Sequence, residues 1–193
     1  FEESSISDLL HSVEDIFAPE CARLGIQWHM HLDPELPPLM MDEHLLIQAL
    51  RNLLRNAIDA LTERKGFTAG DGEETYVPQL RLSARLDGHF VTFTVEDNGH
   101  GIADGDVEHI FEPYYSTKFG GSGLGLMVVY RIVTEHRGRL HVDSQPGQGT
   151  RFIISLPLEK RPVRLLGHQT EEHNMPVTIG PAGHDEGGRR REV

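Results

Sequence analysis

One helical segment constrains this chain more than any other. Residues 42–61, DEHLLIQALRNLLRNAIDAL, carry apolar side chains on one face and amides on the other. At about 100° per residue, a polar stripe forms from Gln48, Asn52, Asn56 and Asp59. Solvated helix faces normally carry Lys and Glu, so two asparagines one turn apart indicate a site. Taken alone, the stripe also fits surface asparagines that bond to a neighbouring loop.

The rest of the chain predicts a mixed sheet with helices on one side. Apolar periodicity predicts helices over residues 5–24, 42–61, 105–111 and 124–136. Alternating apolar residues predict strands over residues 26–32, 79–86, 89–95, 140–143 and 150–156, with Asp87-Gly88 joining one hairpin. The economical arrangement is a two-layer α/β sandwich, whose mixed and mostly antiparallel sheet is covered on one face by helices.

The pattern divides the chain into one domain, residues 1–160, and a tail or linker, residues 161–193. The second part is rich in Gly, Pro and His and has no convincing period, so we expect it to be flexible. The segment 63–78 is a loop by composition. Because the first residue is Phe1, we expect a fragment of a longer protein.

The charge of the chain restricts its partners. A net charge of -12 argues against sequence-independent binding of nucleic acid. A phosphate ligand would need a metal ion, backbone N–H groups and a few local cations. Cys21 is the single cysteine and has no internal partner, which fits a cytoplasmic compartment. No apolar run approaches the roughly 18 residues of a membrane helix, so we expect no membrane contact by this domain. A membrane anchor elsewhere in the parent protein is an alternative that the sequence leaves open.

Chemistry can be assigned to four polar clusters between the predicted elements. In the first, the side-chain oxygen of Asn56 is a neutral, hard ligand suited to Mg²⁺. In the second, Asp97-Asn98-Gly99-His100-Gly101 follows a strand. There Asp97 can accept a hydrogen bond from an exocyclic amine of a base, and the glycines admit a planar ligand. An ordinary Asx turn is the alternative for this cluster.

The third and fourth clusters precede a helix. Residues 120–126, GGSGLGL, expose N–H groups at the positive end of the helix dipole, which favours phosphate. Neither a Walker nor a Rossmann motif is present there. Just before them, residues 111–118, FEPYYSTK, place aromatic anchors and Lys118 next to the phosphate-binding glycines.

Together these clusters resemble the ATP-binding catalytic domain of sensor histidine kinases, a member of the Bergerat-fold superfamily. NLLRNAIDAL resembles the N box, VEDNGHGI the first glycine box, IFEPYYSTK the F box, GGSGLGL the second glycine box and PGQGT the final glycine turn. The resemblance covers residues 5–158. It implies a kinase that binds ATP and Mg²⁺ for two-component signal transduction.

Residue by residue, the resemblance implies that Asn56 holds Mg²⁺ and that Asn52 supports the phosphates and metal waters. Asp97 would hydrogen-bond the adenine amino group, with help from Thr150, and residues 113–122 would form a lid over ATP. The full set of implied binding residues is Asn52, Asn56, Asp97, Gly99, Gly101, Lys118, Gly121, Ser122, Gly123, Leu124, Gly125 and Thr150.

Two positions refine this interpretation. The gyrase, mismatch-repair and heat-shock chaperone ATPases resemble this fold but carry a water-activating glutamate where this chain has Asn52, which favours phosphoryl transfer over hydrolysis. Many histidine kinases carry a lysine where this chain has Asp59. Lys118 or Arg55 is then the candidate cation for the phosphates, or the site depends more heavily on Mg²⁺.

No catalytic acceptor histidine is expected in this chain. The family's acceptor lies on a dimerising helical hairpin, and none of the twelve histidines here has that context. The resemblance thus implies this hairpin and a response regulator as partners, a mainly monomeric fragment and a homodimeric parent. The alternatives are an ATP-hydrolysing conformational clamp and a non-catalytic nucleotide-binding sensor module.

Overall fold

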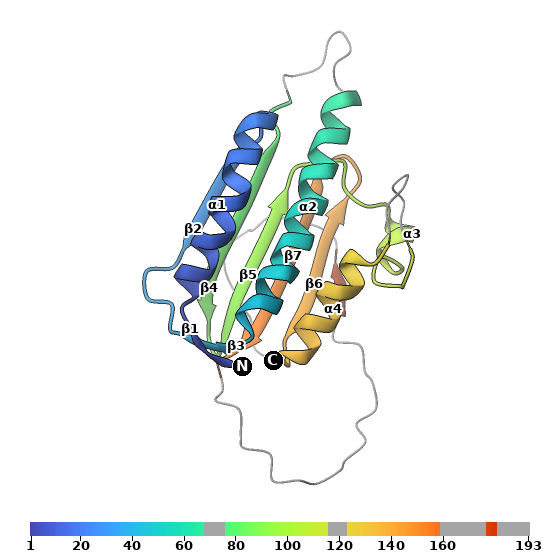
Figure 1. Cartoon of the computed structure of the whole chain (residues 1–193). Coiled ribbons are helices and arrows are strands. Elements are labelled where there is room, and N and C mark those ends of the chain that lie inside the picture. The colour runs from blue at the N-terminus through green and yellow to red at the C-terminus, as the bar shows by residue number, and fades with distance from the viewer. Residues whose placement is uncertain (68–75, 116–122, 159–176, 181–193) are drawn as a thin grey trace, which may run out of the picture.

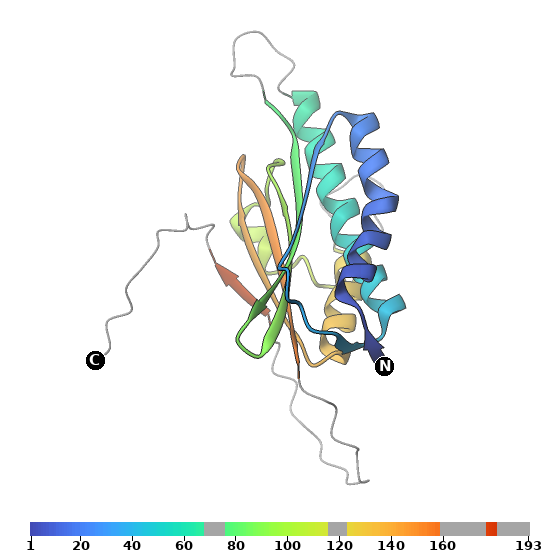
Figure 2. The ribbon, with the colours of Figure 1, turned by 90° about the vertical axis from the view of Figure 1, so that its left-hand side faces the viewer.

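The computed structural model describes residues 1–67, 76–115, 123–158 and 177–180, where helices cover one face of a six-stranded sheet (Figures 1 and 2). The elements are β1 (Glu2–Ser4), α1 (Ile6–Leu24), β2 (Gln27–Leu32), β3 (Leu39–Met41), α2 (Glu43–Phe67), β4 (Gln79–Asp87), β5 (Phe90–Asp97), α3 (Asp104–Val107), α4 (Gly125–Glu135), β6 (Arg139–Gln145), β7 (Gly149–Pro157) and β8 (Val177–Gly180). None of the helices in these ranges is long and apolar enough to cross a membrane.

The strand order of the main sheet is β2-β4-β5-β7-β6-β8. The outer pairs β2/β4 and β6/β8 are parallel, and the inner pairs are antiparallel. Strands β1 and β3 form a separate antiparallel pair. Helices α1, α2 and α4 lie together on one side of the sheet (Figure 2). The structure therefore confirms the predicted two-layer α/β sandwich.

The core lies between the helices and the sheet. The leucine face of α2 is buried, with Leu46, Leu50 and Leu54 fully shielded from solvent. Residues of β5 such as Phe93 and Val95 meet it from the sheet. Full burial of one such side chain contributes about 1.5–3 kcal/mol. This burial fixes the rotation of α2, so that its amide stripe faces away from the core.

Asp42 caps the start of α2. The Leu45 N–H donates to Asp42 Oδ1 over 3.1 Å. The Asp42 N–H in turn donates to His136 Nε2 over 3.0 Å, a contact from the end of α4 that the sequence does not reveal. The buried ring of His136 also lies 4.6 Å from the ring of Phe1. The N-terminal strand, α2 and α4 thereby meet at one corner.

Most predicted elements are confirmed, and the differences concern short or exposed segments. Helix α2 continues to Phe67, so the predicted loop from residue 63 is wrong for its first five residues. The predicted helix 105–111 is only one turn long, at Asp104–Val107. Strands β1, β3 and β8 are not predicted because three or four residues show too little alternation. Strand β8 pairs with β6 from within the predicted tail, whose other residues lie outside the described ranges.

Candidate functional site

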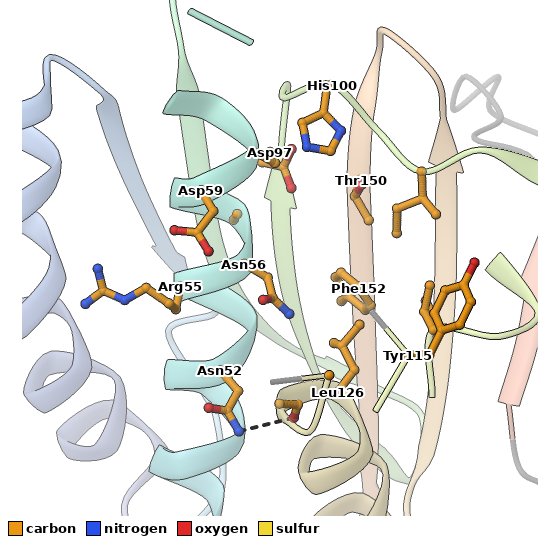
Figure 3. Close-up of a pocket in the computed structure, with 16 residues that line it drawn as sticks. Asn52, Arg55, Asn56, Asp59, Asp97, His100, Tyr115, Leu126, Thr150 and Phe152 are labelled. Atoms are coloured by element: carbon orange, nitrogen blue, oxygen red, sulfur yellow. Dashed lines mark hydrogen bonds between the residues drawn. The ribbon is translucent and has the colours of Figure 1, made fainter. Parts of the chain in front are cut away.

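A cavity of about 330 Å³ opens between α2, the turn after β5 and the start of α4 (Figure 3). Among the predicted site residues it is lined by Asn52, Asn56, Asp97, Gly123, Gly125 and Thr150. Its apolar wall includes Ile102, Ile110, Leu126 and Phe152. The cavity therefore combines flat apolar surfaces with a few polar groups, as small-ligand sites do.

Three other predicted residues lie in the segments that frame the cavity. Gly99 and Gly101 belong to the turn after β5, and Leu124 immediately precedes α4. Lys118, Gly121 and Ser122 lie outside the described residues, as does most of the predicted lid, residues 116–122. Gln48, the first member of the amide stripe, does not line the cavity.

The amide stripe of α2 forms one wall of the cavity. Asn52, Asn56 and Asp59 line it from successive turns of the helix (Figure 3). The Asn52 Nδ2 donates to the Gly125 carbonyl oxygen over 3.2 Å. This contact fixes the Asn52 amide against the first turn of α4, so the two predicted phosphate-binding elements are held together.

Arg55, one of the candidate cations, lines the cavity, but its guanidinium is directed toward α1. The Arg55 guanidinium contacts the Glu20 carboxylate of α1 over 2.7 Å and lies 5.8 Å from the centroid of the Phe17 ring. The hydrogen bond to Glu20 raises the pKa of Arg55 above its ordinary value, so the side chain remains charged. Figure 3 shows it extending toward α1. Arg55 thus links α2 to α1 through this ion pair, and Lys118 remains the candidate cation for the phosphates.

Asp97 lies at the end of β5, where a tight turn holds its carboxylate. The Gly99 N–H donates to Asp97 Oδ1 over 2.8 Å, and Asp97 is only 7% exposed. A Cβ atom at Gly99 would lie 2.7 Å from that oxygen and 2.9 Å from the Ala60 carbonyl carbon of α2. Glycine is therefore required for this turn to pack against the helix. A carboxylate held in this way can accept a hydrogen bond from an amino group in the cavity.

The turn between β6 and β7 supports the opposite side of the Asp97 turn. The Gly147 N–H donates to the His100 carbonyl oxygen over 2.7 Å. Gly101 has φ of +74°, and a Cβ atom there would overlap the Gln145 carbonyl oxygen. Thr150 is the Cα partner of Asp97 across β5 and β7. This pairing explains why Thr150 shares the cavity with Asp97.

Ser144 connects Thr150 to the loop after β5. Its hydroxyl accepts from the Ile102 N–H over 2.8 Å and lies 3.0 Å from Thr150 Oγ1. It also donates to the Gly149 carbonyl oxygen over 3.0 Å. Ser144 is buried, so these bonds fix the Thr150 hydroxyl and the Ile102 backbone relative to each other.

Two supporting residues come from a segment that is predicted to be a loop. Arg64, in the extension of α2, donates to the carbonyl oxygens of Asn98 over 2.7 Å and Gly99 over 3.1 Å. Its guanidinium also lies 4.5 Å from the ring centroid of Tyr76, whose hydroxyl donates to the same Asn98 oxygen over 3.1 Å. Burial raises the pKa of Tyr76, so its phenol stays a donor. Only the tertiary structure reveals these two residues, because neither belongs to a sequence motif.

The described end of the F-box segment is anchored near the cavity. The Tyr115 hydroxyl donates to Asp106 Oδ1 over 2.5 Å, and this bond raises the pKa of the phenol. Gly123 has φ of +65° and packs so closely on Tyr114 that a Cβ atom would overlap the Tyr114 carbonyl carbon. Tyr114 itself has φ of +64°. The residues that flank 116–122 on either side are therefore in direct contact.

Known proteins match most of this chain. The family described as "Histidine kinase-, DNA gyrase B-, and HSP90-like ATPase" matches residues 41–160. The chain is similar to sporulation kinase E of Bacillus subtilis (strain 168), with 31% identity over 160 residues. That match covers 83% of this chain and 20% of the relative, so the chain spans about a fifth of that protein's length.

Solved structures show the same fold. The catalytic domain of histidine kinase ThkA superposes with a TM-score of 0.69 and 26% identity, covering 82% of this chain and 95% of that domain. Full-length ShkA, solved in complex with AMPPNP, superposes with a TM-score of 0.68 and 29% identity, covering 84% of this chain and 32% of ShkA.

Proposed function

Because this chain belongs to the family of histidine kinase-, DNA gyrase B- and HSP90-like ATPases, we propose that it donates the γ-phosphoryl group of Mg-ATP to a histidine on a helical hairpin of its parent protein. The observation that carries the proposal is the convergence of Asn56 and Asp97 on one cavity from α2 and from the end of β5. An amide for the phosphate end and a carboxylate for the adenine end then face the same ligand.

In this proposal, different residues of the cavity contact different parts of the nucleotide. Asp97, with Thr150 beside it, receives the adenine amino group, and the apolar wall covers the base. Asn52 and the first turn of α4 face the phosphates, where backbone N–H groups at Gly125 favour an anion. Transfer of this kind depends mainly on positioning and charge neutralisation.

Asn56 suits a magnesium ion. Its amide oxygen is a hard, neutral ligand, and Mg²⁺ usually binds through one or two protein oxygens together with phosphates and water. When bound, the ion neutralises charge on the phosphate oxygens. Asn56 would hold it from α2, one turn away from Asn52, which supports the same phosphates.

Asn52 also favours transfer over hydrolysis. An amide has no proton-accepting function at neutral pH, so it cannot activate water as a glutamate would. Its Nδ2 is further committed to the Gly125 carbonyl oxygen. Both properties of Asn52 support transfer of the phosphoryl group to an acceptor outside the cavity.

The parent protein completes the proposed reaction. The acceptor hairpin makes the parent a homodimer, this domain works in the cytoplasm, and a response regulator receives the phosphoryl group. The sensor and kinase names of the relatives support this two-component role.

Labelled Mg-ATP, mixed with this chain and the separately produced hairpin of the parent, tests the proposal. We expect acid-labile phosphate on the hairpin histidine. Steady ATP turnover without transfer would instead favour the ATP-hydrolysing clamp, and ATP binding without either would favour a sensor module.

Calorimetric binding of Mg-ATP distinguishes the site residues. Asp97→Asn should weaken binding at least about tenfold, because the amide turns a donor toward the adenine amino group. Asn56→Asp should weaken it by placing a negative charge beside the phosphates. Asp33→Asn is a matched control, since Asp33 accepts from the Leu86 N–H over 3.0 Å and does not line the cavity. Unchanged binding by both site variants would refute the assignment.

A further inference from the structure

Helix α4 is hydrogen-bonded to α2 at both of its ends. At its first residue, the Gly125 carbonyl oxygen accepts from Asn52 Nδ2 over 3.2 Å. At its C-cap, His136 Nε2 accepts from the Asp42 N–H over 3.0 Å. The end of α4 therefore lies beside the start of α2, and the two helices run antiparallel to each other (Figure 1).

The His136 ring is buried and does not line the cavity. The Asp42 N–H can only donate, so Nε2 is its acceptor, and Nδ1 then donates to the Ile132 carbonyl oxygen over 2.8 Å. The Phe1 ring lies against the same ring, with 4.6 Å between the centroids. Because both ring nitrogens are used in these contacts, His136 can affect a ligand in the cavity only through the elements that it joins.

Hydrogen bonds at both ends give α4 a direction that apolar packing alone defines less sharply. The helix buries Val129, Ile132 and Val133, and the hydrophobic effect that holds them is non-directional. With 11 residues, α4 is about 16 Å long. Over that length a tilt of about 4° moves one end by about 1 Å relative to the other. A displacement of this size is large enough to disturb a binding geometry.

The first turn of α4 contains the groups that face the phosphates in the proposed nucleotide site, and Gly125 and Leu126 line the cavity there. We propose that His136 is a positioning residue for the nucleotide, which anchors the far end of α4 to α2 and thereby directs the first-turn N–H groups toward the phosphates. This inference rests on the nucleotide site proposed above. Without the anchor, α4 can tilt about its remaining bond to Asn52, and the affinity for ATP falls.

Two substitutions of His136 that differ by one methylene group test the anchor. The amide of His136→Gln reaches the position of Nε2, so its oxygen can accept from the Asp42 N–H. The amide of His136→Asn reaches only the position of Nδ1 and leaves that N–H without its acceptor. Both substitutions remove the ring contact with Phe1, so the difference between them isolates the bond to Asp42.

Calorimetric binding of Mg-ATP to the whole chain compares these variants. We expect the Kd of His136→Asn to be about three- to tenfold larger than that of the unmodified chain, and the Kd of His136→Gln to stay within about twofold of it. Val13→Ala is the matched control, because Val13 is a fully buried residue of α1 that does not line the cavity. It should lower the midpoint of thermal unfolding and leave Kd unchanged, which separates positioning from a merely structural role.

NMR of the nucleotide-free chain gives a second readout, at the opposite end of α4. The backbone amide of Gly125 and the side-chain amide of Asn52 report the position of the first turn. Their resonances should shift in His136→Asn, shift less in His136→Gln and stay in place in Val13→Ala. Unchanged resonances in His136→Asn would overturn the anchor.

The outcomes distinguish this inference from the function on which it rests. Absence of Mg-ATP binding by the unmodified chain would overturn the nucleotide site, while the NMR comparison would still test the anchor. If the Kd of His136→Asn is no larger than that of His136→Gln, His136 does not position the nucleotide. Thermal unfolding of each variant sets a measurement temperature at which all of them are folded.

Discussion

Asn52 and Gly125 are joined across the cavity by a hydrogen bond of 3.2 Å from the Asn52 Nδ2 to the Gly125 carbonyl oxygen. The bond links α2 to the first residue of α4, the two elements that would face the phosphates. It also gives Asn52 a structural role, which a carboxylate at the same position could not perform because it has no donor.

Asn52→Asp should therefore weaken both the fold and the site. The carboxylate would face the Gly125 carbonyl oxygen, so we expect a loss of about 1–3 kcal/mol in the free energy of unfolding, together with weaker Mg-ATP binding. Urea titration and calorimetry measure the two effects. Gln48→Ala is the control on the same helix outside the cavity, with an expected change within about 0.5 kcal/mol. Equal stability of the two variants would contradict the role of this bond.

Gly101→Ala should destabilise the chain by about 2–4 kcal/mol, because its φ of +74° is strained for alanine and the new Cβ would overlap the Gln145 carbonyl oxygen. Gly147→Ala separates these causes. Gly147 has φ of +76° with no atom within 4 Å of an added Cβ, so only strain of about 1 kcal/mol is expected. Chemical denaturation compares them, and similar losses would show that the close approach is unimportant.

Arg64→Lys should reduce the affinity for Mg-ATP and lower the free energy of unfolding by about 1–2 kcal/mol. Lysine keeps the charge but cannot reproduce the planar contact with Tyr76 and both carbonyl bonds. Arg131→Lys is the control, because that side chain is 77% exposed and pairs with Glu135 on the surface. If the two substitutions have the same effect on binding, Arg64 does not support the Asp97 turn.

The contact between His109 and Glu112 predicts a local dependence on pH. The hydrogen bond from the ring to the Glu112 carboxylate raises the pKa of His109 above its ordinary value of 6.5. Because the folded-state pKa is the higher one, the stabilisation is complete below pH 6.5 and is lost as pH rises through the folded-state pKa.

NMR titration of the His109 ring measures this shift directly. Glu112→Gln should bring the pKa back toward 6.5, because it removes the largest cause. Glu108→Gln should have a smaller effect, since that carboxylate acts only through its charge. The assignment fails if the Glu108 substitution lowers the pKa more than the Glu112 substitution.

Cys21 should be unreactive in the folded chain. Its side chain is fully buried, and burial raises the pKa of the thiol to about 11. Only the thiolate is strongly nucleophilic, so a thiol reagent near the ordinary thiol pKa of about 8.5 should label Cys21 only as the chain unfolds. Labelling rates with and without urea measure this, and rapid labelling of the native chain would be the contrary result.

Much of the site was predictable because its residues lie in local motifs. The resemblance to the ATP-binding catalytic domain of sensor histidine kinases is confirmed by the family match over residues 41–160. The positions of Asn52, Asn56, Asp97 and Thr150 on one cavity agree with it. Their individual roles stay predictions, as do those of Lys118, Gly121 and Ser122, which lie outside the described residues.

The parts that sequence reasoning missed depend on contacts between distant segments. Arg64 and His136 carry no local signal, because each acts on a backbone group far along the chain. The last turns of α2 look like loop by composition, yet side chains there bond to the glycine turn. The sequence makes Arg55 a candidate for phosphate binding, but in the structure its guanidinium pairs with Glu20 of α1.

The sequence by itself determined the two faces of α2, the hairpins and the order of the nucleotide-binding motifs. Helical period, strand alternation and glycine placement are local properties, and burial of the leucine face then turns the amides outward. Only the tertiary structure decided where each polar side chain finds its partner: Asn52 at Gly125, Arg55 at Glu20 and His100 at Glu63. The physical reason is that hydrogen bonds and ion pairs act over a few ångströms, and chain packing alone brings such groups that close.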